Sequence, residues 1–194
     1  MAYLDVLCAH LSRIPADQLQ YLDNEVSLDL PKLGEKSVPE AVSAVRAHIQ
    51  SIGELQARLN YAAHLYSCLA VLGILRPWVL YRVDKRESHG DVVGDILKKI
   101  RHRRVVGLFT KVTKNICCSC MLAPDEERGR DYKPYFFVIW HTQPCVAIYE
   151  APEGHSMLLA NALRQTLGPQ PESLRCGVYQ DLSSAHFGAL QFFS

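Results

Sequence analysis

Long apolar runs are absent from this sequence of 194 residues. The longest candidate, Cys68 to Leu75, is far shorter than the ~20 residues that a membrane-spanning helix needs. The first residues include Asp5 and His10 and lack a basic start, which argues against a signal peptide. Low-complexity blocks and long polar tails are missing as well. We therefore expect a soluble globular protein without a membrane partner.

A large excess of either charge is also missing, since the formal net charge is +1. This value constrains the partners only weakly, because a neutral protein can be locally basic. Residues 98–104 concentrate five cations in seven positions at the end of an expected helix. Two interpretations remain open for this basic run. It is either a solvated helix end whose cations complement the helix dipole, or a surface that contacts phosphates.

Motifs of the common enzyme classes are missing too. The sequence contains no P-loop, dinucleotide-binding fingerprint, nucleophile elbow or zincin motif. Seven of the eight histidines are scattered without a partner pattern, and His102 lies in the basic run. We therefore expect no catalytic residues, no cofactor and no enzyme activity.

Seven cysteines are present, and Cys117, Cys118 and Cys120 are crowded together. An odd number at this spacing does not fit a disulfide framework, so a reducing compartment is favoured, the cytosol or the nucleus. With His141 and Cys145 the cluster could form a zinc or thiol centre, which is one open hypothesis. Zinc knuckles, however, place their cysteines in a turn, whereas adjacent strand residues point to opposite faces. We interpret the cysteines as buried small hydrophobes and predict no metal site.

The first 82 residues have the spacing of helices. Apolar residues recur at helical intervals from Tyr3 to Ile14, and a second short helix fits Ala16 to Asp23. Residues 37–40 have the pattern of a capping box with proline in the first turn of the next helix. Another helix is expected from about Glu54 to Gly73. Five or six such helices predict a small antiparallel bundle over residues 1–82.

The second part of the chain, residues 83–194, changes character. A polar linker, 84–90, precedes an amphipathic helix at 91–103, and turn-bounded strands follow. The expected strands are residues 105–112, 115–122, 135–140, 145–150 and 174–180. The expected later helices are residues 157–167 and 181–192, the last one capped by Ser183 or Ser184. The predicted class is α+β, a helical bundle followed by a domain with a mainly antiparallel sheet.

The stretch DYKPYFFVIWHTQPCVAIYE, residues 131–150, is the most apolar part of this sheet. In a strand, successive side chains point to opposite faces of the sheet. The runs Phe136 to Trp140 and Cys145 to Ile148 are apolar at every position, which predicts strands that are covered on both faces. The polar start, Tyr132-Lys133, precedes a proline that restricts the approach to the strand. We therefore expect these two residues, at the edge of the hairpin, to be the functional part.

The same stretch carries a resemblance to a known family. Tyr132-Lys133-Pro134, Phe137-Val138, Thr142-Gln143-Pro144 and Leu158-Leu159 resemble a segment of the centromere protein N family of inner-kinetochore proteins. Similar matches lie at Leu11 to Pro15, at Lys36-Ser37-Val38, at Trp78 and at Asp181-Leu182. The resemblance covers essentially the whole chain, at low identity but in consistent order. No single motif is specific, so the collinearity carries it.

The resemblance implies a pyrin-like, or death-fold-like, helical domain at 1–82 packed on a homology domain at 83–194. In the family these domains recognise the nucleosome that contains the centromere-specific histone variant, in the nucleus at the centromere and kinetochore. We expect the same non-enzymatic role in chromosome segregation, beside other inner-kinetochore proteins. A further C-terminal domain of the family pairs with centromere protein L, and this partner is expected only if the full protein contains that domain.

The resemblance also implies two sets of contact residues. The implied histone contacts are Asp5, Tyr132 and Lys133. The implied DNA contacts are Arg13, Lys36, Arg76, Arg101 and Arg128. About six basic positions of the family are occupied by other residues here, among them Cys8, Ala9, Glu153, Gly154, Ser183 and Ala185. Fewer phosphate contacts predict weaker DNA binding, unless the basic run 98–104 compensates. The alternative is a death-fold-like interaction adaptor that does not bind nucleosomes.

Overall fold

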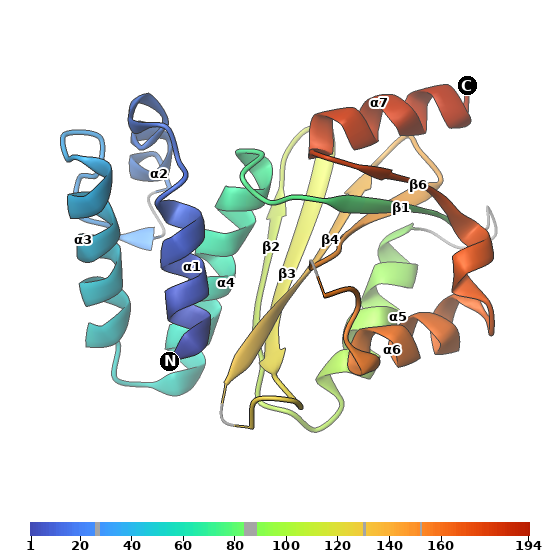
Figure 1. Ribbon diagram of the computed structural model, residues 1–194, viewed down its shortest axis with the longest axis horizontal. Helices are drawn as coiled ribbons and strands as arrows, with labels where there is room; N and C mark the ends of the chain where they lie inside the picture. Colours follow the sequence, from blue (N-terminus) through green and yellow to red (C-terminus); the bar gives the residue numbers. More distant parts are fainter. Residues whose placement is uncertain (26–27, 84–88, 130, 152) are drawn as a thin grey trace.

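The computed structural model describes residues 1–25, 28–83, 89–129, 131–151 and 153–194. Within these ranges lie seven α-helices and one six-stranded sheet whose paired strands are all antiparallel, so the predicted α+β class is confirmed (Figure 1). Most of the predicted polar linker, 84–88, lies outside the described residues. Among the described helices, none has the length and apolar character that crossing a bilayer requires.

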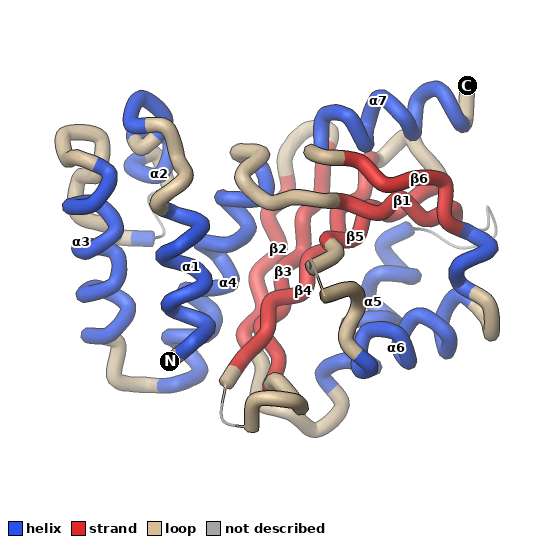
Figure 2. Tube along the Cα trace, in the orientation of Figure 1, coloured by secondary structure: helices blue, strands red, loops and turns tan. Residues whose placement is uncertain are grey.

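Within the described residues, the N-terminal part contains four α-helices and, between α1 and α2, a short 3-10 helix (Figure 2). They are α1 (Ala2–Leu11), η1 (Ala16–Gln18), α2 (Gln20–Asp23), α3 (Val38–Ser51) and α4 (Leu55–Val71). The predicted capping box starts α3, where Ser37 Oγ accepts from the N–H of Glu40 and the Glu40 carboxylate accepts from the N–H of Ser37 at 2.9 Å. The single helix predicted at 16–23 is instead divided into η1 and α2.

Helix α4 lies between the other N-terminal helices and the sheet (Figure 1). Every residue from Ala62 to Ala70 is buried, because α4 meets α1 and α3 on one side and strands on the other. The approach to the sheet is close at Gly107, where a Cβ atom would lie 2.3 Å from the carbonyl oxygen of Leu59. Only glycine permits this contact between two backbones.

Six strands form the sheet in the order β2-β3-β4-β5-β1-β6. Their bounds are β1 (Trp78–Arg82), β2 (Gly107–Val112), β3 (Ile116–Pro124), β4 (Tyr132–Trp140), β5 (Cys145–Tyr149) and β6 (Arg175–Tyr179). The expectation that the first 82 residues are helical is therefore wrong for residues 78–82, which form β1 between β5 and β6. A short apolar run does not reveal by its periodicity whether it is helix or strand, and here two partner strands decide.

Both faces of the sheet are covered, as the continuous apolar runs at 136–140 and 145–148 predicted. On one face Phe136, Val138 and Trp140 of β4 join a core with α1, α3, α4 and the C-terminal helix α7 (Leu182–Phe192). On the other face Phe137 and Ile139 pack with α5 (His89–Arg101) and α6 (Met157–Leu167). The chain thus has three layers with the sheet in the middle (Figure 1).

The C-terminal helices begin at different caps. Ser156 Oγ accepts from the N–H of Leu159 at 3.2 Å and starts α6, whose predicted bounds are confirmed. For α7 the predicted cap is wrong. Asp181 is the N-cap, and its Oδ1 accepts from the N–H of Ser184 at 2.7 Å. A short 3-10 helix, η3 (Pro171–Leu174), connects α6 to β6.

Strand β4 begins three residues earlier than predicted, and this determines where the site lies. Tyr132 and Lys133 pair with Pro124 and Ala123 of β3, so they belong to the strand. On its other side β4 pairs with β5 only from Phe137 to Ile139. The N-terminal half of β4 is therefore a local sheet edge. Pro134, which has no backbone N–H to donate, is tolerated because, among the described residues, no strand pairs with that side of β4 there.

Candidate functional site

A cleft of about 590 Å³ opens at this local edge. Its walls come from α1, from the β3–β4 loop at residues 125–131, from the start of β4 and from the segment that precedes α6. Five of the eight predicted contact residues line it, although they lie in four separate segments of the chain. They are Arg13, Arg76, Arg128, Tyr132 and Lys133.

Helix α1 is held against the sheet side by contacts of Tyr3. The backbone N–H of Tyr3 donates to Asp131 Oδ1 at 3.0 Å, and the Tyr3 and Tyr132 rings meet edge to face at 5.8 Å between centroids. The buried Tyr66 of α4 donates its hydroxyl to the carbonyl oxygen of Tyr3 at 3.3 Å. Because Asp131 accepts at the first turn of α1, its charge also complements the helix dipole. Tyr132 is thus an anchoring residue of this wall as well as a predicted contact residue.

The β3–β4 loop is organised by Asp125. Its backbone N–H donates to the carbonyl oxygen of Asp131 at 2.8 Å, which closes the loop. Its Oδ1 accepts from the N–H groups of Glu127 at 3.0 Å and Arg128 at 3.4 Å, as in an Asx turn. The Arg128 side chain is exposed at the rim of the cleft. The hydrogen bonds of Asp125 therefore hold Glu127 and Arg128 in a turn that leaves the Arg128 side chain exposed.

The basic run reaches this loop through Arg104. Its guanidinium pairs with Glu126 at 2.5 Å, and it also donates to the carbonyl oxygen of Ile100 at 3.3 Å. Lys98 and Lys99 are engaged elsewhere, with Asp95 at 3.6 Å and with Thr166 Oγ1 at 2.8 Å. Much of the run thus has partners within the chain.

Lys133 has an internal partner that sequence reasoning did not predict. Its Nζ donates to Glu153 Oε1 at 3.1 Å, and only 19% of the Lys133 side chain is exposed. A hydrogen bond from its own backbone N–H, and then the charges of Lys133 and Arg128, hold the pKa of Glu153 below its usual value. Glu153 occupies a position where the resemblance implies an arginine. In this chain the Glu153 carboxylate instead compensates the charge of Lys133.

His10 and Arg13 form the α1 end of the cleft. The Arg13 guanidinium lies against His10 Nδ1, and burial followed by the Arg13 charge lowers the pKa of His10 to about 4. His10 is therefore neutral at physiological pH.

Arg76 is exposed on the other side of the cleft. Hydrogen bonds with the backbone and side chain of Ser184, and then the charge of Arg76, lower the pKa of Asp181.

Three predicted contact residues lie outside the cleft. Asp5 faces α3, where its carboxylate pairs with Arg46 at 2.8 Å, although 62% of the Asp5 side chain remains exposed. Lys36 is half-buried next to the capping box of α3. Arg101 ends α5, on the other face of the sheet. The structure therefore does not bring these three residues into the cleft.

Several cleft residues were missed at the level of sequence. Four carboxylates, Asp125, Glu127, Asp131 and Glu153, line it together with the cations. His155 also lines it, and its Nε2 lies 3.0 Å from the hydroxyl of Tyr81, while its buried Nδ1 has no partner among the described atoms. No local pattern distinguishes these residues, because the folding of distant segments brings them together.

The positions that departed from the family pattern are in part buried. Cys8 is 5% exposed and Ala185 is fully buried, so neither can contact a partner. Ser183 is exposed and lines a second hollow, of about 630 Å³, between α7 and Tyr179 of β6. Aromatic residues such as Phe187 and Phe192 dominate that hollow, and none of the eight predicted contact residues lines it. We therefore take the cleft, which contains the charged groups, as the candidate site.

The cysteines of β3 alternate as predicted. Cys118 and Cys120 are buried on the α4 side of the sheet, and Cys117 packs on the opposite side. Within the described part of the chain they do not form a group of metal ligands with His141 or Cys145. All seven cysteines are free thiols. Neither the protein-family models nor the curated proteins with which we compared the sequence match this chain.

Proposed function

We propose that this chain is a non-enzymatic nucleosome-binding module of the inner kinetochore, of the centromere protein N type. In this proposal the cleft receives an exposed loop of the centromere-specific histone variant, and cations at its rim contact the adjacent DNA. The chain then acts in the nucleus, at the centromere, with other inner-kinetochore proteins. Centromere protein L is a further partner if the full protein has the corresponding C-terminal domain.

The observation that carries this proposal is the convergence of the cleft residues. The resemblance implies contact roles for Arg13, Arg76, Arg128, Tyr132 and Lys133 through local sequence matches alone. They are up to 120 residues apart, and they line a single cleft. Such a gathering supports a common binding role for them.

The charge of the cleft supports a mixed protein and DNA partner. Its four carboxylates attract arginine or lysine side chains, which a histone loop can supply. Its arginines at the rim attract phosphates. A cleft for bare DNA alone would be expected to lack the carboxylates, because they repel the phosphate backbone. The exposed side chain of Arg128 makes it the strongest candidate for a phosphate contact.

We further propose that the N-terminal helices form a pyrin-like bundle that acts as one wall of the cleft. The alternative, a separable death-fold-like adaptor, is less well supported by the packing of α4. Leu59, Leu65 and Leu69 of α4 belong to the same core as Phe136 and Val138 of β4. A fragment that ends at residue 82 would expose this apolar side of α4 to water. Self-association of such a fragment would therefore not distinguish the two functions, and tests need the full chain.

The proposal is tested by gel-shift titration of the full chain on nucleosomes that contain either the centromeric variant or the ordinary histone. We expect tighter binding to the variant. The double substitution Arg13→Ala with Arg128→Ala should weaken binding and reduce the slope of log K against log salt by about 1.8, two phosphate contacts at ~0.9 each. Arg164→Ala, which removes an exposed arginine of α6 outside the cleft, is the matched control and should leave the slope unchanged.

Two results would contradict the proposal. Equal and weak binding to both nucleosomes would remove the histone specificity. A salt slope near zero for the unsubstituted chain would show that its cations do not contact phosphates. If in addition a protein partner is captured through the exposed side of the helical bundle, the adaptor function becomes the better explanation.

A further inference from the structure

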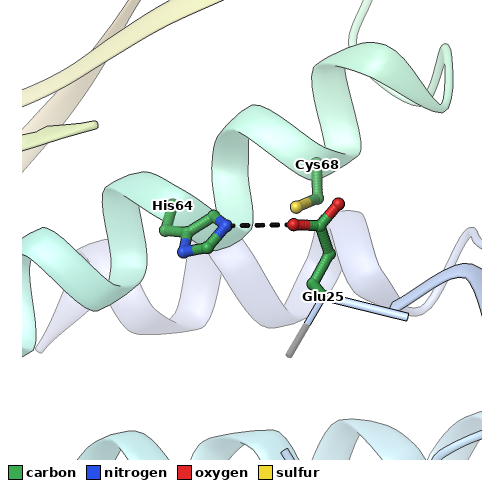
Figure 3. A group of neighbouring side chains, drawn as sticks. All are labelled: Glu25, His64 and Cys68. Carbon is green, nitrogen blue, oxygen red and sulfur yellow. Dashed lines mark hydrogen bonds and ion pairs between the residues drawn. The ribbon is translucent and has the colours of Figure 1, made fainter. Parts of the chain in front are cut away.

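Three side chains with metal-binding chemistry meet beside α4, away from the cleft (Figure 3). His64 and Cys68 lie four residues apart on this helix, so they share one face and are separated by one turn. Glu25, just after α2, points toward them. The carboxylate, imidazole and thiol ligand atoms all lie within 4.8 Å of one another, and His64 Nε2 is 3.3 Å from Glu25 Oε2.

We propose that Glu25, His64 and Cys68 bind one zinc ion. Nitrogen, sulfur and oxygen donors together are the ligand set of zinc, whereas calcium and magnesium require oxygen ligands throughout. Three protein ligands leave a fourth position for water or a further group. The inference is independent of the nucleosome proposal, because none of the three residues lines the cleft.

The spacing of the ligand atoms is close to that of a tetrahedral site. With bond lengths of ~2.0–2.3 Å, two ligands of a tetrahedral zinc ion lie roughly 3.3–3.6 Å apart. The imidazole and carboxylate atoms already have this separation, 3.3 Å. The remaining separations stay below 4.8 Å and need to shorten by no more than about 1.3 Å, which a change of the Cys68 rotamer can provide.

Burial prepares two of the ligands for a metal. His64 is 5% exposed and Cys68 is 4% exposed. Burial lowers the pKa of His64, so the imidazole is neutral and can donate its lone pair to an ion. Burial raises the pKa of Cys68 to about 12, so the thiol keeps its proton until a cation displaces it. Zinc coordination supplies that cation, since a coordinated thiol is deprotonated.

Neighbouring residues hold the ligands in place. The His64 ring stacks on Phe109 of β2, with 3.6 Å between centroids and 10° between the planes. Lys111 of the same strand pairs with Glu25 Oε1, which leaves Oε2 directed at His64. Outer partners of this kind orient metal ligands in many sites. The positive charge of Lys111 repels the zinc ion. We expect the negative charges of Glu25 and of the Cys68 thiolate to offset this repulsion.

A zinc ion here would connect three parts of the fold. Glu25 belongs to the segment between α2 and α3, His64 and Cys68 to α4, and Lys111 to β2 of the sheet. Since the folded chain binds the ion and the unfolded chain lacks the site, the bound ion would stabilise the fold by mass action. Binding of the ion is therefore expected to raise the stability of the fold.

The test is a titration of the purified full chain, first stripped of metal with a chelator. Zinc affinity is measured by competition with a chromophoric chelator, and cobalt(II) is titrated in parallel as a visible probe. We expect one zinc ion per chain, a thiolate-to-cobalt charge-transfer band and a higher melting temperature with zinc. Cys68→Ser and His64→Gln should each lower the zinc affinity by more than about 100-fold, since even outer partners of ligands contribute 10- to 100-fold.

Two matched substitutions control for thiols elsewhere. Cys117→Ser and Cys176→Ser each remove a half-buried cysteine and should leave zinc affinity and the cobalt band unchanged. Circular dichroism and melting in the presence of chelator identify any variant that fails to fold. For such a variant, Glu25→Gln provides the replacement test, because it keeps the shape of the side chain and should also weaken zinc binding.

The proposal is overturned if the stripped chain binds much less than one zinc ion per molecule. It is also overturned if folded Cys68→Ser keeps the cobalt band, or if Cys117→Ser abolishes it, because the thiolate would then belong to the β3 cysteines. None of these readouts involves nucleosomes. A failed nucleosome test therefore leaves this inference unaffected, and the reverse holds as well.

Discussion

The helical bundle meets the sheet at two junctions that differ in kind. At the closed junction α4 packs on β2 and β3 through apolar side chains, and Gly107 lets two backbones approach. At the open junction α1 meets the β3–β4 loop and the edge of β4 through Tyr3, Asp131 and Tyr132, and a charged cleft of about 590 Å³ remains. The same two layers are thus joined tightly at one side and loosely at the other.

The difference lies in where each junction places its charged groups. At the closed junction Glu25, His64 and Lys111 are largely removed from water, so each depends on the others for compensation. At the open junction charged groups such as Arg128 remain in contact with water, where a pair contributes little to stability. The closed junction is therefore expected to determine stability, and the open junction to determine binding.

The largest effect is expected from Gly107→Ala at the closed junction. The new Cβ would lie 2.3 Å from the carbonyl oxygen of Leu59, so α4 and β2 must separate. We expect the free energy of unfolding to fall by about 3 kcal/mol, measured by urea denaturation. Gly94→Ala in α5 is the control, because its Cβ meets no atom within 4 Å, and it should stabilise by about 0.5–1 kcal/mol. A similar small gain at Gly107 would contradict the close approach.

A smaller loss is expected from Glu25→Ala, measured in metal-free buffer. Burial raises the pKa of Glu25, but Lys111 and then His64 outweigh it and lower the pKa overall, so the carboxylate is charged in the folded chain. Its removal leaves Lys111 and His64 without their acceptor, which should cost about 1–3 kcal/mol. Glu35→Ala, an exposed carboxylate before α3, should change stability by less than about 0.5 kcal/mol. Equal effects of the two would show that the closed junction does not depend on this charge.

At the open junction Glu153→Gln should alter binding more than stability. The substitution releases Lys133 from its 3.1 Å pair, and the freed cation can meet a nucleosome. We expect several-fold tighter nucleosome binding and a salt slope that steepens by up to ~0.9. Stability should change by less than about 1 kcal/mol. Glu172→Gln in η3 makes the same charge change outside the cleft and should leave both quantities unchanged. Unaltered binding by Glu153→Gln would argue that Lys133 serves only the fold.

The smallest effect is expected from Asp5→Asn. Asp5 and Arg46 form an exposed pair between α1 and α3, so its loss should cost less than about 1 kcal/mol of stability. If Asp5 meets a histone arginine, as the resemblance implies, Arg46 competes for it. Asp5→Asn should then weaken nucleosome binding slightly, and Arg46→Ala should strengthen it slightly, in the same gel-shift titration. Effects of the same sign, or no effect of either variant, would mean that the pair acts only within the chain.

Local features of the fold were predictable from the sequence. The capping box at Ser37 involves residues three apart, so a short pattern contains both partners. The alternation of Cys117 and Cys118 follows from strand geometry alone. The strand at 78–82 was missed because its identity depends on β5 and β6, which follow much later in the chain.

The site was predictable only in part. Matching to the family pattern selected five residues that line the cleft, yet it did not reveal the carboxylates beside them. The pairs Lys133–Glu153 and Asp5–Arg46 join residues 20 and 41 positions apart, at separations that follow no secondary-structure period. Only one local feature of the sequence indicates the group of Glu25, His64 and Cys68. It is the four-residue spacing that places His64 and Cys68 on one face of a helix.

The sequence by itself determined which residues are buried in β4, where α3 and α6 begin and how the β3 cysteines alternate. These properties depend on periodicity and on hydrogen bonds within a few residues, which any chain with this pattern must form. The tertiary structure alone decided which charges remain available to a partner. Arg128 stays exposed, whereas Lys133 is neutralised by Glu153 and Glu25 is enclosed with Lys111 and His64. The reason is that an ion pair depends on how distant segments are brought together in space, and no local pattern contains that information.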